Sequence, residues 1–282
     1  MKPPRLGGRS APIIGERRWN ASAARWLAIA AAVALASACG RGGDWRTPAG
    51  AGKTADSAAG YVSPPRFTAA DRRADGQVEI VGRAQPNAHI QLATPDGTVF
   101  AAVTDSRGAF SLAVSAAPAV RLFGLSETEA GRPVRGEGYL AILPTPGRPA
   151  AVLRAGAGAQ ALSPPAGKLA LTAVDFDSGG GAVVSGLARP GAPVRLTVDN
   201  GAGGETRADA DGRFSFTLAA ALKPGDHVLV VQSANGRAQA RIQVSPGEAI
   251  SGVPFRGRRQ SGGWRIDWLT PAGGEQTTLI LD

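Results

Sequence analysis

An internal repeat constrains the fold of this chain more than any other feature. Residues 82–112 and 186–216 align without a gap at an offset of 104 residues, and ten of the 31 aligned positions are identical. A duplicated segment of this kind is the signature of a repeated structural unit. The identities fall mostly at turn and core positions: Gly82/Gly186, Ala84/Ala188, Pro86/Pro190, Ala88/Ala192, Leu92/Leu196, Gly97/Gly201, Asp105/Asp209, Gly108/Gly212, Phe110/Phe214 and Ser111/Ser215.

Each copy reads as a series of short strands. Val194–Val198 alternates apolar and polar residues, as a half-buried strand does. Asp96-Gly97 and Asn200-Gly201 supply hairpin turns, and no helical period persists after the N-terminal region. Strands separated by turns every 8–12 residues are typical of antiparallel sandwiches, so we predict an all-β protein with two tandem sandwich modules.

The repeated motifs resemble two known domain families. The shared pattern is G-x-A-x-P-x-A-x-[IV]-x-L, then D-G or N-G, then D-x-x-G-x-F. It is similar to bacterial immunoglobulin-like domains and to the carboxypeptidase regulatory-like domain. The resemblance implies Ig-like β-sandwiches, which serve as spacers, adhesive modules or receptor parts, and it brings no catalytic residues with it.

A fainter repeat follows each copy. Residues 135–154 and 256–281 each have Arg-Gly, a variable stretch, a strand, a Thr-Pro turn and another strand. We therefore predict that each module carries an appended β-hairpin, and we hypothesise that the duplicated unit was sandwich plus hairpin.

These patterns divide the chain into six segments. They are a signal peptide (1–38), a lipidated cysteine with a disordered stalk (39–70), the first module with its hairpin (71–156), a linker (157–167), the second module (168–248) and a C-terminal hairpin segment (249–282).

The one cysteine lies at the end of an export signal. Residues 26–38 are uncharged and follow Arg25, but a run of 13 is too short to span a bilayer. The small residues 36–38 lead into Cys39, which resembles the lipobox of bacterial lipoproteins, although Ala36 stands where Leu is usual. The resemblance implies that Cys39 is lipidated and anchors the mature chain to a membrane. An ordinary cleaved signal and an uncleaved anchor remain alternatives.

The same resemblance suggests a location. Gly40 stands where Asp favours inner-membrane retention, which implies outer-membrane sorting, with the protein facing the periplasm of the cell envelope. Arg17-Arg18 leaves twin-arginine export open beside the general route. In residues 40–70, Gly, Ala, Pro, Ser and Thr make up 21 of 31 positions, which predicts a disordered stalk because little apolar surface is available for burial.

Composition excludes several partners and cofactors. The net charge of +9 comes largely from residues 1–38, which carry six basic residues against Glu16, so we expect no nucleic-acid partner. One Cys and two His exclude a disulfide framework and a Cys/His zinc site. We expect no cofactor and no metal.

Two weaker patterns suggest chemistry. Asp209 and Asp211 resemble part of a calcium loop that Asp175 and Asp177 could complete, but ordinary turn formation explains these residues better. The chain has two histidines (His89 and His227) but no positioned nucleophile, so we predict no catalytic residues.

The C-terminal segment is the strongest candidate surface. Trp264 and Trp268 fall on one face of a strand, with Arg265 and Asp267 on the other. Arg256, Arg258 and Arg259 come just before them. Trp faces stack on sugars and Arg binds phosphate, so these residues could bind an envelope glycan. Packing of both Trp side chains against the second module is the competing interpretation.

These observations lead to one functional expectation and two alternatives. We expect a non-enzymatic, lipid-anchored cell-envelope protein that presents Ig-like modules to a protein or a cell-wall glycan. The alternatives are a purely structural spacer or adhesin and a periplasmic hydrolase with an unrecognised site.

Overall fold

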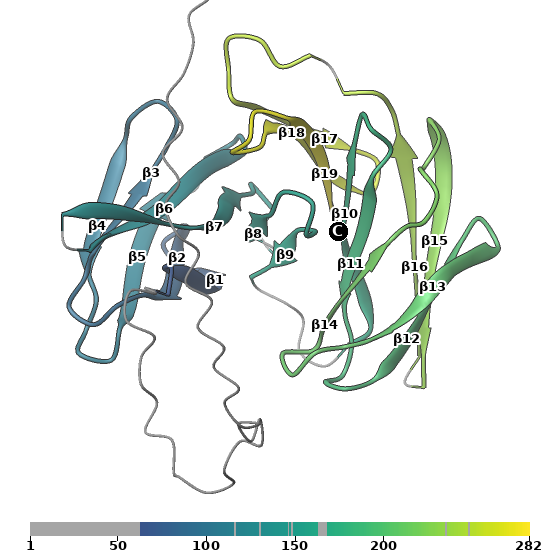
Figure 1. Ribbon diagram of the computed structural model, residues 1–282, viewed down its shortest axis with the longest axis horizontal. Coiled ribbons are helices and arrows are strands. Elements are labelled where there is room, and N and C mark those ends of the chain that lie inside the picture. The colour runs from purple at the N-terminus through teal and green to yellow at the C-terminus, as the bar shows by residue number, and fades with distance from the viewer. Residues whose placement is uncertain are drawn as a thin grey trace, which may run out of the picture. The chain divides into compact units, whose positions relative to one another are not determined.

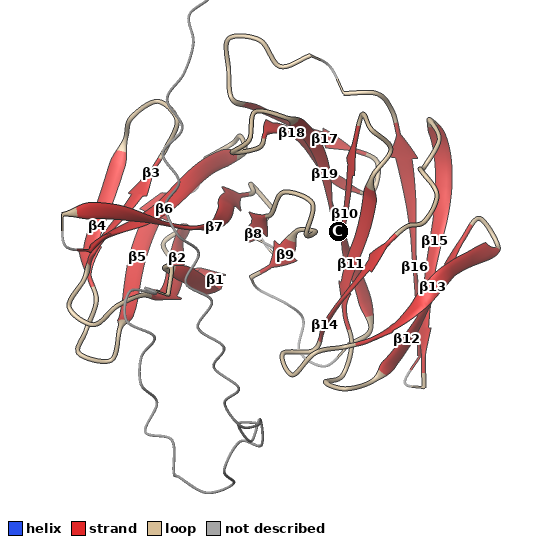
Figure 2. Ribbon diagram, in the orientation of Figure 1, coloured by secondary structure: helices blue, strands red, loops and turns tan. Residues whose placement is uncertain are grey.

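The described part of the chain consists of β-strands and their connections. The computed structural model describes residues 63–282 except 116, 130, 146, 148, 163–167, 235 and 248. Every regular element in this part is a strand (Figures 1 and 2), which confirms the predicted all-β class. No helix in these residues has the length and apolar character of a membrane span. The predicted signal peptide, Cys39 and most of the stalk lie outside the described residues.

The first module consists of two antiparallel sheets that pack face to face. Their orders are β1-β2-β5 and β4-β3-β6-β7-β8-β9. The strands are β1 (Arg66–Arg72), β2 (Gln77–Arg83), β3 (His89–Ala93), β4 (Val99–Val103), β5 (Ala109–Ser115), β6 (Arg121–Glu129), β7 (Arg132–Ile142), β8 (Ala150–Leu153) and β9 (Gln160–Ala161).

The second module and the C-terminal segment together form two antiparallel sheets, and from here on the second module includes that segment. Their orders are β14-β11-β10-β19-β18-β17 and β13-β12-β15-β16. The strands are β10 (Ala170–Asp177), β11 (Ala182–Leu187), β12 (Pro193–Val198), β13 (Gly201–Arg207), β14 (Arg213–Thr217), β15 (Gly225–Ser233), β16 (Gly236–Val244), β17 (Phe255–Gln260), β18 (Gly263–Leu269) and β19 (Glu275–Leu281).

The repeat is longer in structure than in sequence. Strands β1–β7 correspond to β10–β16 in order and pairing. Five of these pairs begin 104 residues apart: Arg66/Ala170, His89/Pro193, Ala109/Arg213, Arg121/Gly225 and Arg132/Gly236. The duplicated unit is therefore a seven-stranded sandwich, of which the sequence identities mark only the central part.

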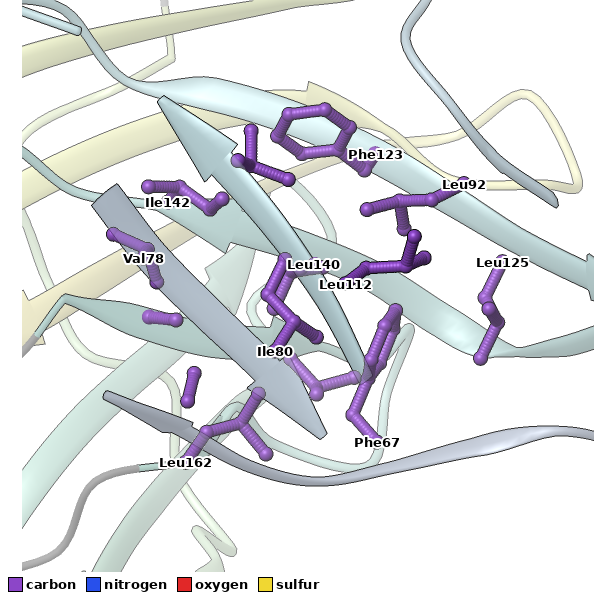
Figure 3. Close-up of a cluster of buried hydrophobic side chains, with 14 of the residues drawn as sticks. Phe67, Val78, Ile80, Leu92, Leu112, Phe123, Leu125, Leu140, Ile142 and Leu162 are labelled. Atoms are coloured by element: carbon purple, nitrogen blue, oxygen red, sulfur yellow. The ribbon is translucent and has the colours of Figure 1, made fainter. Parts of the chain in front are cut away.

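Alternating apolar side chains form a core inside each sandwich. In the first module, Val78 and Ile80 of β2 share one core with Leu92 and Leu140 of the opposite sheet, and all four are fully buried (Figure 3). In the second module, Val184, Leu196 and Leu229 occupy the corresponding core. The period-two patterns follow directly from the alternation of side chains along a strand.

The repeated Asp and Gly residues form turns. The Oδ1 atom of Asp105 accepts hydrogen bonds from the N–H groups of Arg107 and Ala109, both at 2.8 Å. The corresponding atom of Asp209 accepts from Asp211 (2.9 Å) and Arg213 (2.8 Å). These hydrogen bonds lower the pKa of Asp105, with the bond from Ala109 contributing most. The turn interpretation of these acidic residues is thus supported.

Two predicted boundaries need correction. The stalk was expected to run to residue 70, but β1 begins at Arg66 and buries Phe67 and Ala70. The linker 157–167 contains β9, and Leu162 within it is buried. The stalk and the linker are both poor in large apolar residues. The few that they have join the core of the first module together with side chains from several other strands.

Both hairpins are present, but they are not equivalent. β7 pairs with β8, and β18 pairs with β19, as predicted. However, β8 joins the sheet that contains β3 and β6, whereas β18 and β19 join the sheet that contains β10 and β11. Arg135 lies in β7, which corresponds to β16 of the second half, whereas Arg256 lies in β17. The two Arg-Gly pairs therefore do not occupy equivalent strands. The fainter repeat is therefore not a duplication of sandwich plus hairpin.

Candidate functional site

The predicted aromatic face of the C-terminal segment is closed. Trp264, Ile266 and Trp268 share one face of β18, as the alternation predicted. Ile266 and Trp268 are 0% exposed, and Trp264 is half-buried. The face therefore offers no pair of exposed indole rings on which a sugar could stack.

Strands of the first module cover this face. Tyr139 meets Trp268 edge-on, with ring centroids 5.8 Å apart. The Trp264 Nε1–H group donates to Thr145 Oγ1 at 2.7 Å. We call the apolar cluster formed here the junction core; its buried members are Val120, Leu122, Ala141, Leu143, Ala151, Leu153 and Ala159 of the first half and Ala173, Ile266, Trp268 and Ile280 of the second.

A polar cluster lies beside the junction core. Asp175 of β10 is 2% exposed and accepts hydrogen bonds from the Ala159 N–H (2.7 Å), Thr278 Oγ1 (2.6 Å) and Gln276 Nε2 (3.1 Å). Burial raises the pKa of Asp175 to about 6, although these hydrogen bonds oppose the rise. Gln276 also accepts from the Gly156 N–H at 3.1 Å, so two polar side chains fasten residues 156–159 to the second module.

The other face of β18 is buried inside the second sandwich. Arg265 is 0% exposed and Asp267 is 4% exposed, and they form an ion pair at 2.9 Å. Arg265 also donates to Ser245 Oγ (2.7 Å) and to the Pro246 carbonyl (3.3 Å), and it lies over the Phe176 ring. A charged group this deeply buried requires such partners, so the pair has a structural role at one end of the sandwich.

The three predicted arginines do not converge. β17 is an edge strand, and its register places Arg256 beside Asp267, Arg258 beside Arg265 and Arg259 beside Trp264. Arg259 therefore faces the opposite side of the sheet from the other two. Its guanidinium forms two hydrogen bonds of 2.7 Å with the Asp282 carboxylate, which raise the pKa of Arg259.

Of the five predicted residues, Arg259 and Trp264 lie in contact with each other. The Arg259 guanidinium lies 5.9 Å from the Trp264 ring centroid. Arg258 and Arg259 are exposed, and Arg256 is half-buried. Charged side chains on an edge strand oppose pairing with other chains, which gives these three arginines a structural explanation.

The two histidines occupy unrelated positions. His89 is exposed on β3. His227 on β15 contacts Asp199 Oδ2 at 2.6 Å through Nδ1 and the Lys223 carbonyl at 2.7 Å through Nε2. Partial burial acts to lower the pKa of His227, but the hydrogen bonds to these two acceptors and the charge of Asp199 raise it overall. Both ring nitrogens are thus engaged, and neither is left to take a proton from a serine.

Among the described residues, no group of three or more His, Cys, Asp or Glu side chains is placed to hold a metal ion. Asp175 is buried at the junction, whereas Asp177 is exposed and accepts from the Gly181 N–H at 3.0 Å. Asp211 forms an ion pair with Arg213 at 2.7 Å. The acidic residues considered for calcium therefore have separate protein partners.

Two of the cavities lie at or near residues considered above. One of about 450 Å³ lies at the end of the second sandwich and combines apolar side chains such as Phe176 and Leu222 with the carboxylates of Asp267 and Glu275. Those carboxylates already bond to Arg265 and to the Ile250 N–H. A polar cleft of about 300 Å³ is lined by residues that include Arg154, Arg207, Arg213 and Ser215. Neither of these two cavities is lined by a histidine.

Sequence reasoning missed Asp175 and the buried Arg265–Asp267 pair as structural centres. The run Leu171–Phe176 held one signal, because a carboxylate among apolar residues of a strand indicates burial. The pairing of Arg265 with Ser245 and Pro246 had no sequence signal, since strand β17 lies between these residues in the chain and the partners are about twenty residues away.

No family model matches the chain, and no curated protein matches it. Among solved structures, it is similar to the BSP domain of a biofilm-associated protein, at 14% identity over 67% of this chain and 30% of that chain (TM-score 0.24). It is also similar to a bacterial ice-binding adhesin, at 16% identity over 64% and 62% (TM-score 0.21). A third is invasin, described as a bacterial integrin-binding protein, at 10% identity over 77% and 54% (TM-score 0.22). Likenesses this weak place no constraint on function.

Proposed function

We propose that this protein is a non-enzymatic, lipid-anchored envelope protein whose two Ig-like modules act as one rigid, adhesin-like spacer. The observation that supports a rigid spacer is the junction core, in which Ile266 and Trp268 are fully buried against strands of the first module. Two modules that share a core move together, because separating them exposes apolar surface to water.

The burial of Trp268 favours the spacer over a glycan-binding surface at this place. A sugar-binding indole must be accessible, and Trp264 is the only one of the two predicted rings with exposed surface. The proposal keeps a protein or glycan partner only at the exposed rim of the junction core, which we define as Arg259 and the Trp264 ring beneath it.

The hydrolase alternative has less support. In the described residues, His227 contacts Asp199 through Nδ1, but its Nε2 atom is hydrogen-bonded to the Lys223 carbonyl. A triad needs that nitrogen for the nucleophile.

The anchor is tested with a Cys39→Ala variant expressed with its export signal. We expect the parent chain to incorporate labelled palmitate and to fractionate with outer membranes, and the variant to do neither. A parent chain that takes up no label would contradict the anchor. A labelled chain in the inner membrane would contradict outer-membrane sorting alone.

The spacer is tested by a pull-down from detergent-solubilised envelope with the mature chain as bait, with Arg259→Ala as the matched variant. A spacer recovers the same background with both baits. A protein or glycan that the parent retains and Arg259→Ala loses would instead establish a binding surface at the rim.

A further inference from the structure

Strand β4 is an uncovered edge of the first module. It ends the six-stranded sheet, and β3 is the only strand that pairs with it among the described residues (Figure 1). Val99 is 53% exposed and Val103 is 57% exposed, and Ala101 between them is also exposed. In the described part of the chain, only one other large apolar side chain, Val253, is comparably exposed.

The backbone of β4 is oriented for pairing on its open side. Thr94 N–H donates to the Thr98 carbonyl at 2.9 Å, and Thr104 N–H donates to the Ala88 carbonyl at 3.0 Å, so the even-numbered positions of β4 bond toward β3. Because hydrogen-bonding direction alternates along an antiparallel strand, the N–H and C=O groups of Val99, Ala101 and Val103 point away from β3.

The second module protects the corresponding edge, and the first does not. On β13, Glu205 and Arg207 stand where β4 has Ala101 and Val103, and Glu205 forms an ion pair with Arg195 at 2.6 Å. A register shift next to Leu196 leaves Gly203 without a partner and bends that edge. Charges and bulges of this kind prevent strand addition. β4 has no charged residue, and its pairing with β3 has no register shift.

We propose that β4 pairs with β4 of a second copy of this chain, antiparallel about a two-fold axis at Ala101. Val99 then lies opposite Val103 of the partner subunit, and each opposed pair exchanges both of its hydrogen bonds. The three residues whose backbone groups are open, Val99, Ala101 and Val103, form a sequence that is symmetric about Ala101. A two-fold axis at Ala101 therefore places like residues opposite one another, which favours a second copy over an unrelated strand. A two-fold contact of this kind closes on itself and yields a dimer, not a fibre.

The geometry is tested by disulfide trapping in the full chain carrying Cys39→Ser, which has no other cysteine. Directly opposed residues have Cα atoms about 5.5 Å apart, within the range that a disulfide spans. Under mild oxidation, Ala101→Cys is expected to form a covalent dimer. Glu205→Cys at the equivalent position of β13 is the matched control and is expected to remain monomeric. Equal cross-linking of both variants would overturn the proposal.

Association is tested by sedimentation of charged variants of the same Cys39→Ser chain, which serves as the parent. Ala101→Glu and Ala101→Lys each place like charges opposite one another across the axis, so each is expected to weaken dimerisation about tenfold or more. An equimolar mixture of the two variants is expected to restore the dimer, which a folding defect would not do. A parent chain that is monomeric at all concentrations, or a mixture that stays monomeric, would overturn the proposal.

Discussion

Asp175 and His227 illustrate how single side chains respond to their surroundings. Both are held by hydrogen bonds to other parts of the chain, but with opposite consequences for charge. Asp175 is buried at the junction, which disfavours its ionised form. His227 sits between two acceptors, which favours its protonated form.

The pKa of Asp175 makes a prediction about pH. The folded chain holds the proton with a pKa of about 6, against 3.8 for the unfolded residue, so stability falls as pH rises between these values. Two pKa units correspond to about 3 kcal/mol of unfolding free energy.

Asp175→Asn removes this titration and leaves one of the three donors without an acceptor, at a cost of about 1–3 kcal/mol. Urea unfolding should show that the difference in unfolding free energy between the parent and the variant is larger at pH 4.5 than at pH 7.5. An advantage that is the same at both values would contradict the assignment.

His227 predicts a second pH dependence. Its pKa is raised above 6.5 in the folded chain, so the stabilisation is fully present below pH 6.5 and is lost as pH rises through the folded pKa. His227→Gln should therefore cost about 1 kcal/mol at pH 5.5, and less at pH 9, in urea unfolding. His89→Gln, on an exposed strand position, serves as the control and should change stability by no more than about 0.5 kcal/mol. A loss for His227→Gln that grows with pH would exclude this role.

Strand β18 shows what neighbours do to an element. Its alternation correctly separated Trp264, Ile266 and Trp268 from Arg265 and Asp267. Because β18 is a central strand between β17 and β19 with a layer on each side, both faces are buried. An alternating pattern usually indicates that the polar face of the strand is exposed to solvent. In β18 the polar residues Arg265 and Asp267 are instead buried as an ion pair.

The repeated Gly–Phe pair is a second element-scale feature. Gly82 on β2 and Gly186 on β11 lie directly opposite Phe110 and Phe214. A Cβ atom at Gly186 would collide with the Phe214 ring and with the Ala170 carbonyl oxygen. Each phenylalanine therefore packs over a glycine on the neighbouring strand, which explains why both residues recur in the repeat.

Substitution of this glycine has a predictable cost. Gly186→Ala should lower the unfolding free energy by about 1–3 kcal/mol, because the ring and the strand must move apart. Gly147→Ala, where a Cβ would meet nothing within 4 Å, should change it by less than about 0.5 kcal/mol. Thermal and urea unfolding of both variants provide the measurement, and equal stability of the two would refute the packing argument.

At the scale of the whole molecule, the junction core turns two sandwiches into one body. It combines an apolar centre around Trp268 with the polar contacts of Asp175 and Gln276. The sheets of this body have edges of different kinds, among them a charged edge at β17, a bulged edge at β13 and an uncharged edge at β4.

The junction core predicts cooperative unfolding. The parent chain should unfold in one calorimetric transition, whereas Trp268→Ala should cost about 3–5 kcal/mol and split the transition in two as the modules separate. Trp264→Phe keeps the ring contact but loses the hydrogen bond to Thr145, so it should cost about 1 kcal/mol and keep one transition. Two transitions in the parent would show that the modules are independent.

Local patterns were sufficient for the all-β class, the duplicated sandwich, the Asp–Gly turns and the alternation of β18. Each of these depends on residues close in sequence, where period and turn chemistry act directly. The start of β1 at Arg66 and the strand β9 were not predictable in this way, since their few apolar residues are buried in a core that several strands build together. The same holds for the residues that cover Trp268, which come from β6–β8.

By itself, the sequence determined the all-β class, the repeated Asp–Gly turns and the presence of two copies of one unit. Only the tertiary structure decided that the proposed aromatic surface is interior, that Asp175 is buried and that β4 is left open. The physical reason is that burial is a property of contacts between segments, and nothing in the alternation of β18 specifies which layer packs against it.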